Sequence, residues 1–298
     1  MTVLASLMRT SAGAAVVLST MLLFGAAAVA QSNGDLRVGG STTLVPSVVN
    51  AASTFMETYE TWAAAGVPMP GQATVIYVTG GGSGFGVKSA SNGTVDIGMA
   101  SRDLKDKEKT ALGDFEAVLV GKDAVAIASN VNNPLVKVRK NLTTEEVRKL
   151  FAGDYKTYKD FDASLPEQEI VLLVRDASAG SAEIMQDKIM GGAKVSPAAL
   201  QMPSQGALVK KLESNANAIA YMSSGLAAES ELIETFSLDG VEPTNANVVK
   251  GDYPLARPLL MIVKGEPDPK AKRFLDYMLA EGQKDVANQG YVPVNGAQ

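Results

Sequence analysis

The chain has 298 residues, with 27 Lys and Arg against 32 Asp and Glu, and it contains neither His nor Cys. Without these two residue types, Ser-His-Asp and Cys-His nucleophile pairs, zinc sites of Cys and His, disulfides and lipid-modified cysteines are excluded. A net charge of −5 gives no basic field for nucleic acid, the hydrophobic content of 46% is typical of a folded protein, and the length suggests about two lobes.

Residues 1–30 have the pattern of a secretory signal peptide. Arg9 is their one charged side chain, an apolar run covers 14–24, and the segment ends in Ala28-Val29-Ala30. A positive start, a short apolar run and a small-residue end are the parts of such a signal. We therefore predict cleavage after Ala30. Because the chain has no Cys to carry a lipid anchor, we expect a free protein of the periplasm.

After residue 30, apolar runs suited to strands alternate with stretches of helical spacing. Pro46 fits the first turn of one helix, and Thr143 with Glu146 forms a capping box at the start of another. This alternation predicts an α/β fold of mostly parallel sheets, in two lobes joined by strands rather than by a flexible linker. The expected strands cover 36–39, 73–78, 95–99, 117–128, 170–174, 218–222 and 259–263, and the expected helices cover 46–63, 143–151, 180–190, 204–212 and 269–279.

Three junctions between a strand and a helix combine small residues with hydroxyl groups. They cover 39–44, 80–84 and 175–181. A helix start offers unpaired N–H groups, glycine allows close backbone approach, and Ser, Thr and Arg add donors that suit a tetrahedral oxyanion. Each feature alone also fits an ordinary helix cap, a tight turn or a solvated arginine. Their recurrence in one α/β chain favours an oxyanion site, with Arg102 and Arg175 as its candidate charges.

A set of short motifs after residue 30 carries a resemblance to a known family. They are Gly40-Ser41-Thr42-Thr43-Leu44-Val45-Pro46, Gly81-Gly82-Ser83-Gly84-Phe85-Gly86, Asp96-Ile97-Gly98-Met99-Ala100-Ser101-Arg102, and the segments 123–128, 142–153, 175–181, 218–221, 253–258 and 290–293. In these motifs and in their order, the sequence resembles the phosphate-binding solute-binding proteins of bacterial ABC transporters, the PstS type. Any one motif is weak, but together they are specific.

The resemblance implies the type II periplasmic-binding-protein fold. Two lobes, each a mostly parallel sheet flanked by helices, would be joined by a two-strand hinge and close on one phosphate. Lobe 1 would cover 31–124 and 252–298, and lobe 2 would cover 125–251. By position in the motifs, the ligand contacts would come from Thr43, Leu44, Ser83, Arg175, Gly180 and Ser181, with Ser41, Thr42, Ser101 and Arg102 as further candidates.

Two departures from the family's pattern bear on the choice of anion. Ala179 stands where the family usually has a serine, so one hydroxyl donor is lost, although Ser178 lies next to it. Arg102 stands where some members have an aspartate that accepts the proton of hydrogen phosphate, and arginine cannot accept. Asp103 and Asp176 are candidates for that acceptor. A site of donors alone would not demand a proton on its ligand, so selection against sulfate stays open.

We predict a binding protein rather than an enzyme, which needs no cofactor or metal and does not bind nucleic acid. Its expected partners are inorganic phosphate and the permease subunits of an ABC importer, and we expect a monomer. The alternatives are a receptor for sulfate, molybdate or tungstate, and a secreted adhesion or scavenging protein that binds phosphate. A secreted enzyme acting on phosphorylated substrates is disfavoured, because the three loops contain neither an acidic cluster nor a nucleophile with an adjacent base.

Overall fold

The computed structural model describes residues 34–294. The predicted signal peptide and its cleavage site after Ala30 lie outside the described residues. Among the helices of the described part, none is long and apolar enough to cross a membrane.

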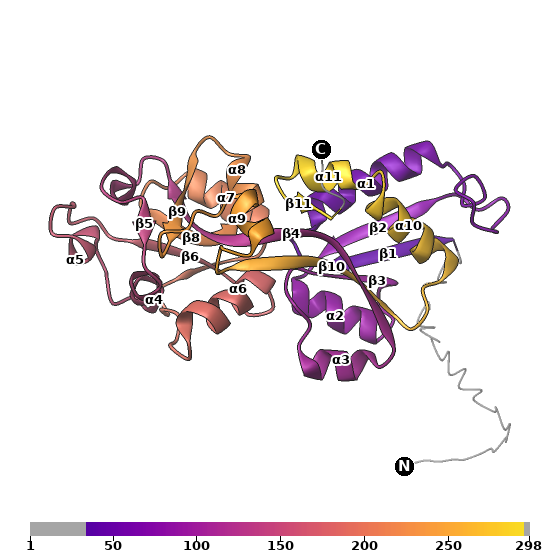
Figure 1. Cartoon of the computed structure of the whole chain (residues 1–298), viewed down its shortest axis with the longest axis horizontal. Coiled ribbons are helices and arrows are strands. Elements are labelled where there is room, and N and C mark those ends of the chain that lie inside the picture. The colour runs from indigo at the N-terminus through magenta and orange to yellow at the C-terminus, as the bar shows by residue number, and fades with distance from the viewer. Residues whose placement is uncertain (1–33, 295–298) are drawn as a thin grey trace, which may run out of the picture. The chain divides into compact units, whose positions relative to one another are not determined.

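The first half of the fold is a sheet in which the strands follow the order β2-β1-β3-β10-β4 (Figure 1). Helices α1 and α2 make the crossovers between its parallel strands, and the last two helices of the chain, α10 and α11, contact α1. Its elements are β1 (Asp35–Gly40), α1 (Val45–Thr58), β2 (Val75–Gly80), α2 (Ser83–Ser91), β3 (Ile97–Ala100), α3 (Asp106–Leu112), β4 (Phe115–Asn130), β10 (Ala256–Lys264), α10 (Pro269–Leu279), α11 (Gln283–Asn288) and β11 (Val292–Pro293).

The second half continues from β4 through β8 and β6 to β7, with β9 also beside β4. Capping boxes open α4 and α5, and the box of α4 is the one that Thr143 and Glu146 predicted. The elements are β5 (Asn141–Leu142), α4 (Thr144–Ala152), α5 (Tyr158–Phe161), β6 (Val171–Arg175), α6 (Gly180–Met185), β7 (Leu200–Met202), α7 (Gln205–Glu213), β8 (Ala218–Ser223), α8 (Ser224–Ala228), β9 (Ile233–Leu238) and α9 (Asn245–Lys250), with a 3₁₀ turn at Pro134–Lys137 and a π-helical turn at Gln186–Met190 after α6.

The α/β fold class is confirmed, but the sheets are mixed rather than mostly parallel. The pairs β1–β2, β1–β3, β5–β9, β6–β7 and β6–β8 are parallel. Each antiparallel pair of these strands in the described part involves β4 or β10, isolated bridges apart. The difference arises because these two strands enter sheets whose other members are joined by helical crossovers, which produce parallel neighbours.

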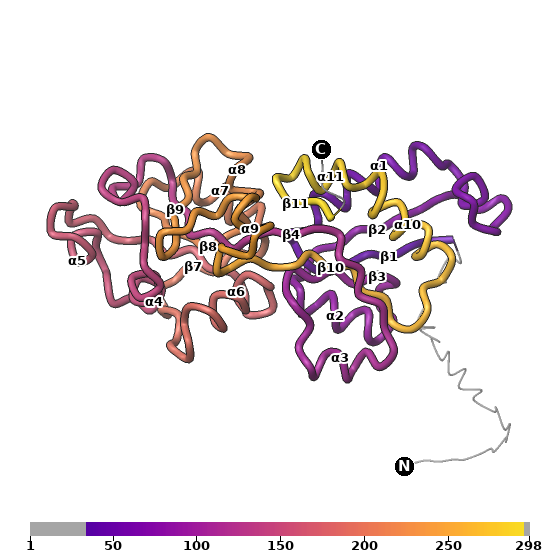
Figure 2. Tube along the Cα trace, viewed as in Figure 1, coloured from indigo at the N-terminus to yellow at the C-terminus, as the bar shows by residue number. Residues whose placement is uncertain are grey.

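Strand β4 belongs to both halves. Its residues 115–124 pair with β10, and its residues 125–129 pair with β8. The chain passes from the first half to the second along β4 and returns along β10 (Figure 2), whose first residue, Ala256, pairs with Ala124. This arrangement provides the two-strand connection that the resemblance implied.

The first helix ends earlier than its apolar spacing predicted. Helix α1 stops at Thr58, because Tyr59 has φ −123° and ψ 85° and Thr61 forms an antiparallel bridge with Ala73. Trp62 is fully buried and donates from Nε1 to the carbonyl of Gly34. The tryptophan thus closes the core at the end of α1 as a packing residue and is not itself helical.

Candidate functional site

The loops that follow β1, β2, β3 and β6 bring a group of buried polar side chains together. In an open α/β sheet, the ends of parallel strands are where ligands bind. The loops contribute hydroxyls and a guanidinium that are at most 4% exposed: Ser41, Thr43, Ser83, Ser101, Arg175 and Ser181. We call this group the polar cluster.

In the first half, the glycine loop and the β3 loop are joined at Ser83 and Ser101. The Ser83 hydroxyl accepts from the backbone N–H of Ser101 at 3.0 Å, and the two hydroxyl oxygens are 3.3 Å apart. Gly40 has φ 142°, and a Cβ on it would overlap the carbonyl oxygen of Met99. Glycine at this position therefore lets β1, α2 and β3 pack closely enough for their loops to meet.

The third loop comes from the second half and lies directly against these serines. A Cβ on Gly180, the first residue of α6, would stand 2.6 Å from Ser83 Oγ and 2.7 Å from Ser101 Oγ. Gly84 donates its N–H to the carbonyl of Ser178 at 3.0 Å. The structure thus brings Ser83, Ser101 and Gly180 together, as expected for contacts with one ligand, and they come from both halves.

Arg175 at the end of β6 is also shared between the halves. Its Nη1 donates to Thr42 Oγ1 at 2.9 Å, and its Nη2 pairs with Asp176 at 3.0 Å. Burial lowers the pKa of Arg175, and the charge of Asp176 offsets only part of that effect. Because even a lowered arginine pKa leaves the group protonated, the cluster keeps a buried positive charge.

Three predicted ligand residues have local partners. The N–H of Leu44 donates to the carbonyl of Ser41 at 3.1 Å, and the Ser41 hydroxyl accepts from the N–H of Thr43 at 3.3 Å. Ser181 Oγ accepts from Gln205 Nε2 at 3.4 Å. The last two contacts are long, and each hydroxyl retains its own O–H as a donor.

Arg102, a further predicted ligand residue, pairs with carboxylates of this chain. It donates to both carboxylate oxygens of Glu108, at 2.8 and 2.7 Å, and its Nε lies 2.8 Å from Glu183 in α6. Burial alone would lower the pKa of Arg102, but the hydrogen bonds and charges of Glu108 and Glu183 raise it above its ordinary value. Lys105 also pairs with Glu183, so a second ion pair joins the two halves here.

Asp103 and Asp176, the two candidate acceptors for a ligand proton, have different surroundings. Asp103 is exposed. Asp176 Oδ1 accepts from the N–H and the hydroxyl of Ser178, and Oδ2 accepts from Arg175. These contacts hold the pKa of Asp176 below its ordinary value although burial acts in the opposite direction.

Sequence reasoning assigned no role to Asp123 and Arg257, which complete the polar cluster. Arg257 pairs with Asp123 at 2.7 Å, and their side chains are 0% and 1% exposed. Arg257 also donates to Ser101 Oγ and Thr43 Oγ1, each at 3.2 Å. Both residues lie in motifs that the resemblance used, and a charged residue next to a long apolar strand run is the signal that could have found them.

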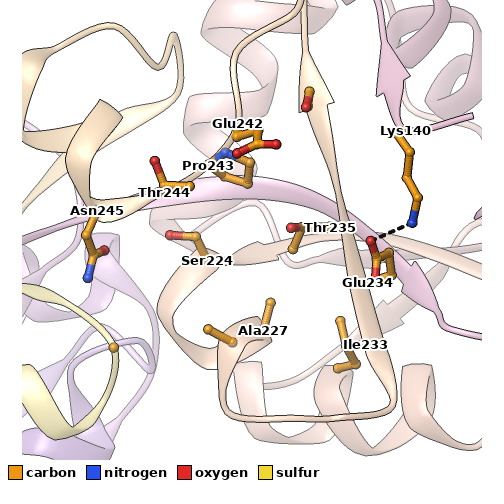
Figure 3. Close-up of a pocket in the computed structure, with 13 residues that line it drawn as sticks. Lys140, Ser224, Ala227, Ile233, Glu234, Thr235, Glu242, Pro243, Thr244 and Asn245 are labelled. Carbon is orange, nitrogen blue, oxygen red and sulfur yellow. Dashed lines mark hydrogen bonds and ion pairs between the residues drawn. The ribbon is translucent and has the colours of Figure 1, made fainter.

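A separate pocket of about 660 Å³ lies beside β9 and the start of α9 (Figure 3). Its one lysine, Lys140, is paired with Glu234 at 2.8 Å, and Glu242 adds a further negative charge. Carboxylates repel an oxyanion, so the polar cluster is the better candidate for an anion site. In the described part of the chain, no group of three or more acidic residues is placed to hold a metal ion.

Comparison with known proteins agrees with this fold. The model of the PBP superfamily domain matches residues 25–281. The phosphate-binding protein PstS of Bacillus subtilis is 30% identical over 269 residues, which cover 89% of this chain and 82% of that protein. PstS of Staphylococcus saprophyticus is 25% identical over 95% of this chain and 88% of its own length. The chain therefore belongs to the PBP superfamily and, within it, to the family of PstS proteins.

Solved structures give the same result. A Clostridium perfringens protein, described as a phosphate ABC transporter substrate-binding protein with bound phosphate, has a TM-score of 0.74 and 28% identity, covering 87% of this chain and 99% of that one. An ABC-type phosphate transport receptor of Vibrio cholerae has a TM-score of 0.66 at 24% identity, covering 86% and 99%, and it supports the fold.

Proposed function

We propose that this protein binds inorganic phosphate between its two halves and delivers it to the permease subunits of an ABC importer. The observation that carries the proposal is the meeting of Gly180 with the hydroxyls of Ser83 and Ser101, because it joins donors of both halves in a buried place. A buried site strengthens charge-assisted hydrogen bonds to an anion. The names of the relatives support phosphate as the ligand.

The proposed ligand contacts follow from where these residues lie. The nine contacts lie in or beside the polar cluster: Ser41, Thr42, Thr43, Leu44, Ser83, Ser101, Arg175, Gly180 and Ser181. Leu44 and Gly180 would contribute backbone N–H groups, and the N–H of Leu44 would exchange the Ser41 carbonyl for the anion. Arg102 is left out of this set, since its donors are held by Glu108 and Glu183, and we assign it a bridging role. In this proposal the first half comprises residues 31–124 and 252–298, and the second half comprises residues 125–251. The protein acts as a periplasmic monomer without catalytic activity.

Titration calorimetry tests the proposal with residues 31–298, unfolded and refolded to remove any carried ligand. We expect one-to-one binding of phosphate, and Arg175→Met should weaken it at least about 100-fold because a charge-assisted donor pair is lost. Arg139→Met is the matched control, since Arg139 is a half-exposed arginine far from these loops in the sequence. No binding of phosphate by the folded parent contradicts the proposal.

The same titration with sulfate, molybdate and tungstate decides the choice of anion. Asp123 is buried and accepts four hydrogen bonds, which leaves it no lone pair for the proton of hydrogen phosphate. Asp176 is partly exposed and accepts three, so rejection of sulfate would have to come from its Oδ2 or from hydroxyl oxygens. Tighter binding of one of these anions than of phosphate would replace phosphate as the ligand.

A further inference from the structure

Arg257 and Asp123 form a buried charge pair at the connection between the halves. They stand opposite each other on the antiparallel strands β10 and β4, next to the pair that Ala256 forms with Ala124. Both Nε and Nη2 of Arg257 donate to Asp123 Oδ2, at 3.2 and 2.7 Å. The pair therefore lies where the chain crosses from one half to the other.

Asp123 is held from the second half and has no acceptor capacity to spare for a ligand. Its Oδ1 accepts from the Ser224 hydroxyl at 3.1 Å and from the N–H of Gly225 at 3.3 Å. Both residues belong to α8. With its two oxygens occupied, the carboxylate fixes the plane of the Arg257 guanidinium, because a paired arginine fork has a fixed geometry.

The remaining donors of Arg257 point at the polar cluster. Nη1 donates to Ser101 Oγ at 3.2 Å and to the Ser101 carbonyl at 3.5 Å, and Nη2 donates to Thr43 Oγ1 at 3.2 Å. These bonds are longer than typical charge-assisted bonds, so an anion can take their place. A hydroxyl that accepts from a guanidinium keeps its own hydrogen for another acceptor. The guanidinium and the two hydroxyls thus present donors to the same place.

We propose that Arg257 is a second guanidinium of the oxyanion site, which donates from Nη1 and Nη2 to an anion held by Thr43 and Ser101, and that Asp123 fixes its orientation. The proposal rests on the proposed function and adds a specificity-determining contact to it. The site then holds two positive charges, Arg175 from β6 and Arg257 from β10, each paired with one carboxylate. The two carboxylates balance these charges, so the site would hold an anion through directed N–H and O–H donors rather than through an excess of positive charge.

Phosphate titrations of paired variants separate this role from a structural one. In Arg257→Met a buried carboxylate is left unpaired, so folding and binding can both suffer. The double variant Asp123→Asn with Arg257→Met removes both charges, and the asparagine still offers an acceptor to Ser224 and Gly225. We expect the double variant to melt cooperatively yet bind phosphate at least about 100-fold more weakly than the parent.

The matched control is the double variant Arg37→Met with Asp96→Asn, which neutralises another ion pair. Arg37 also lies in a strand, its distance to Asp96 is 2.7 Å, and both side chains are partly exposed. It should bind phosphate as the parent does. If the double variant at 123 and 257 binds within about threefold of this control, Arg257 does not contact the anion and the inference is wrong.

Arg257→Lys keeps the positive charge, and it provides a second test of the inference if the double variant Asp123→Asn with Arg257→Met does not fold. Lysine lacks the planar fork, so it cannot pair with Asp123 and reach Thr43 and Ser101 at once. We expect a folded protein with about tenfold weaker phosphate binding, and parental affinity would contradict the inference. Failure of the parent itself to bind phosphate would instead overturn the proposed function, and this inference with it.

Discussion

Gly180 shows how one residue can set the distance between the two halves. Its α-carbon faces the hydroxyls of Ser83 and Ser101, with no room for a methyl group between them. Glycine is needed here because the backbone lies close to these hydroxyls, and not because of an unusual backbone angle. Gly180 is the first residue of α6 and is not among the glycines with positive φ. The sequence motif indicated a glycine near an anion but could not show which groups it would face.

The substitution Gly180→Ala should weaken phosphate binding by about tenfold or more, because its Cβ would push the third loop away from Ser83 and Ser101. Gly206→Ala is the control, since Gly206 also lies in the first turn of a helix and its nearest neighbour, Ser204 Oγ, is 4.0 Å away. Calorimetric titration of both variants measures the effect. Equal affinities for the two would show that the approach at Gly180 does not matter for binding.

At the scale of elements, α3 and α6 are linked by ion pairs. Arg102 precedes α3 and joins Glu108 of that helix to Glu183 of α6, and Lys105 adds a second contact to Glu183. Helix α6 follows the third anion loop directly. The link therefore positions that loop against the first half, which is the bridging role assigned to Arg102.

The pH dependence of stability should reveal this link. Burial alone would raise the pKa of Glu108, but hydrogen bonds from Arg102 and from the N–H of Lys105 hold it below its ordinary value. A carboxyl with a lowered folded-state pKa stabilises the protein above its unfolded-state pKa, and this stabilisation is lost as pH falls through the folded-state value. Glu108→Gln should thus cost about 1–2 kcal/mol of unfolding free energy near neutral pH.

Urea unfolding across the pH range measures this difference. The gap between the parent and Glu108→Gln should close below the ordinary pKa of a glutamate, about 4.3. Glu145→Gln is the control, because Glu145 is 56% exposed and pairs with Arg148 on the surface. A gap that persists unchanged into acid would mean that Glu108 stabilises the fold through packing and not through its charge.

For the molecule as a whole, periodicity predicted seven of the eleven strands and five of the eleven helices in the described residues, but not the directions of the strands. Strands β4 and β10 were found as apolar runs, yet the antiparallel pairing that they impose depends on contacts between distant segments. Strand β9 was missed, since it lies far from its partner β4 in the sequence and its alternation is incomplete. The loops of the candidate site were visible as motifs, whereas the Asp123–Arg257 pair appears only when β4 and β10 meet.

Net charge and burial together predict a weak salt dependence of binding. The chain carries a net charge of −5, so long-range attraction does not draw an anion to it. Buried donors are screened far less than exposed ones. The phosphate dissociation constant should change less than about threefold between about 50 and 300 mM sodium chloride. A steep loss of affinity over that range would indicate a surface site in place of the polar cluster.

The most direct test of the central claim is a crystal structure of residues 31–298 grown with phosphate. The account predicts one phosphate between the two halves, within hydrogen-bond distance of Thr43, Ser83 and Arg175 and next to Gly180. A phosphate bound to one half alone, or at the pocket beside β9 with the polar cluster unchanged, would contradict it.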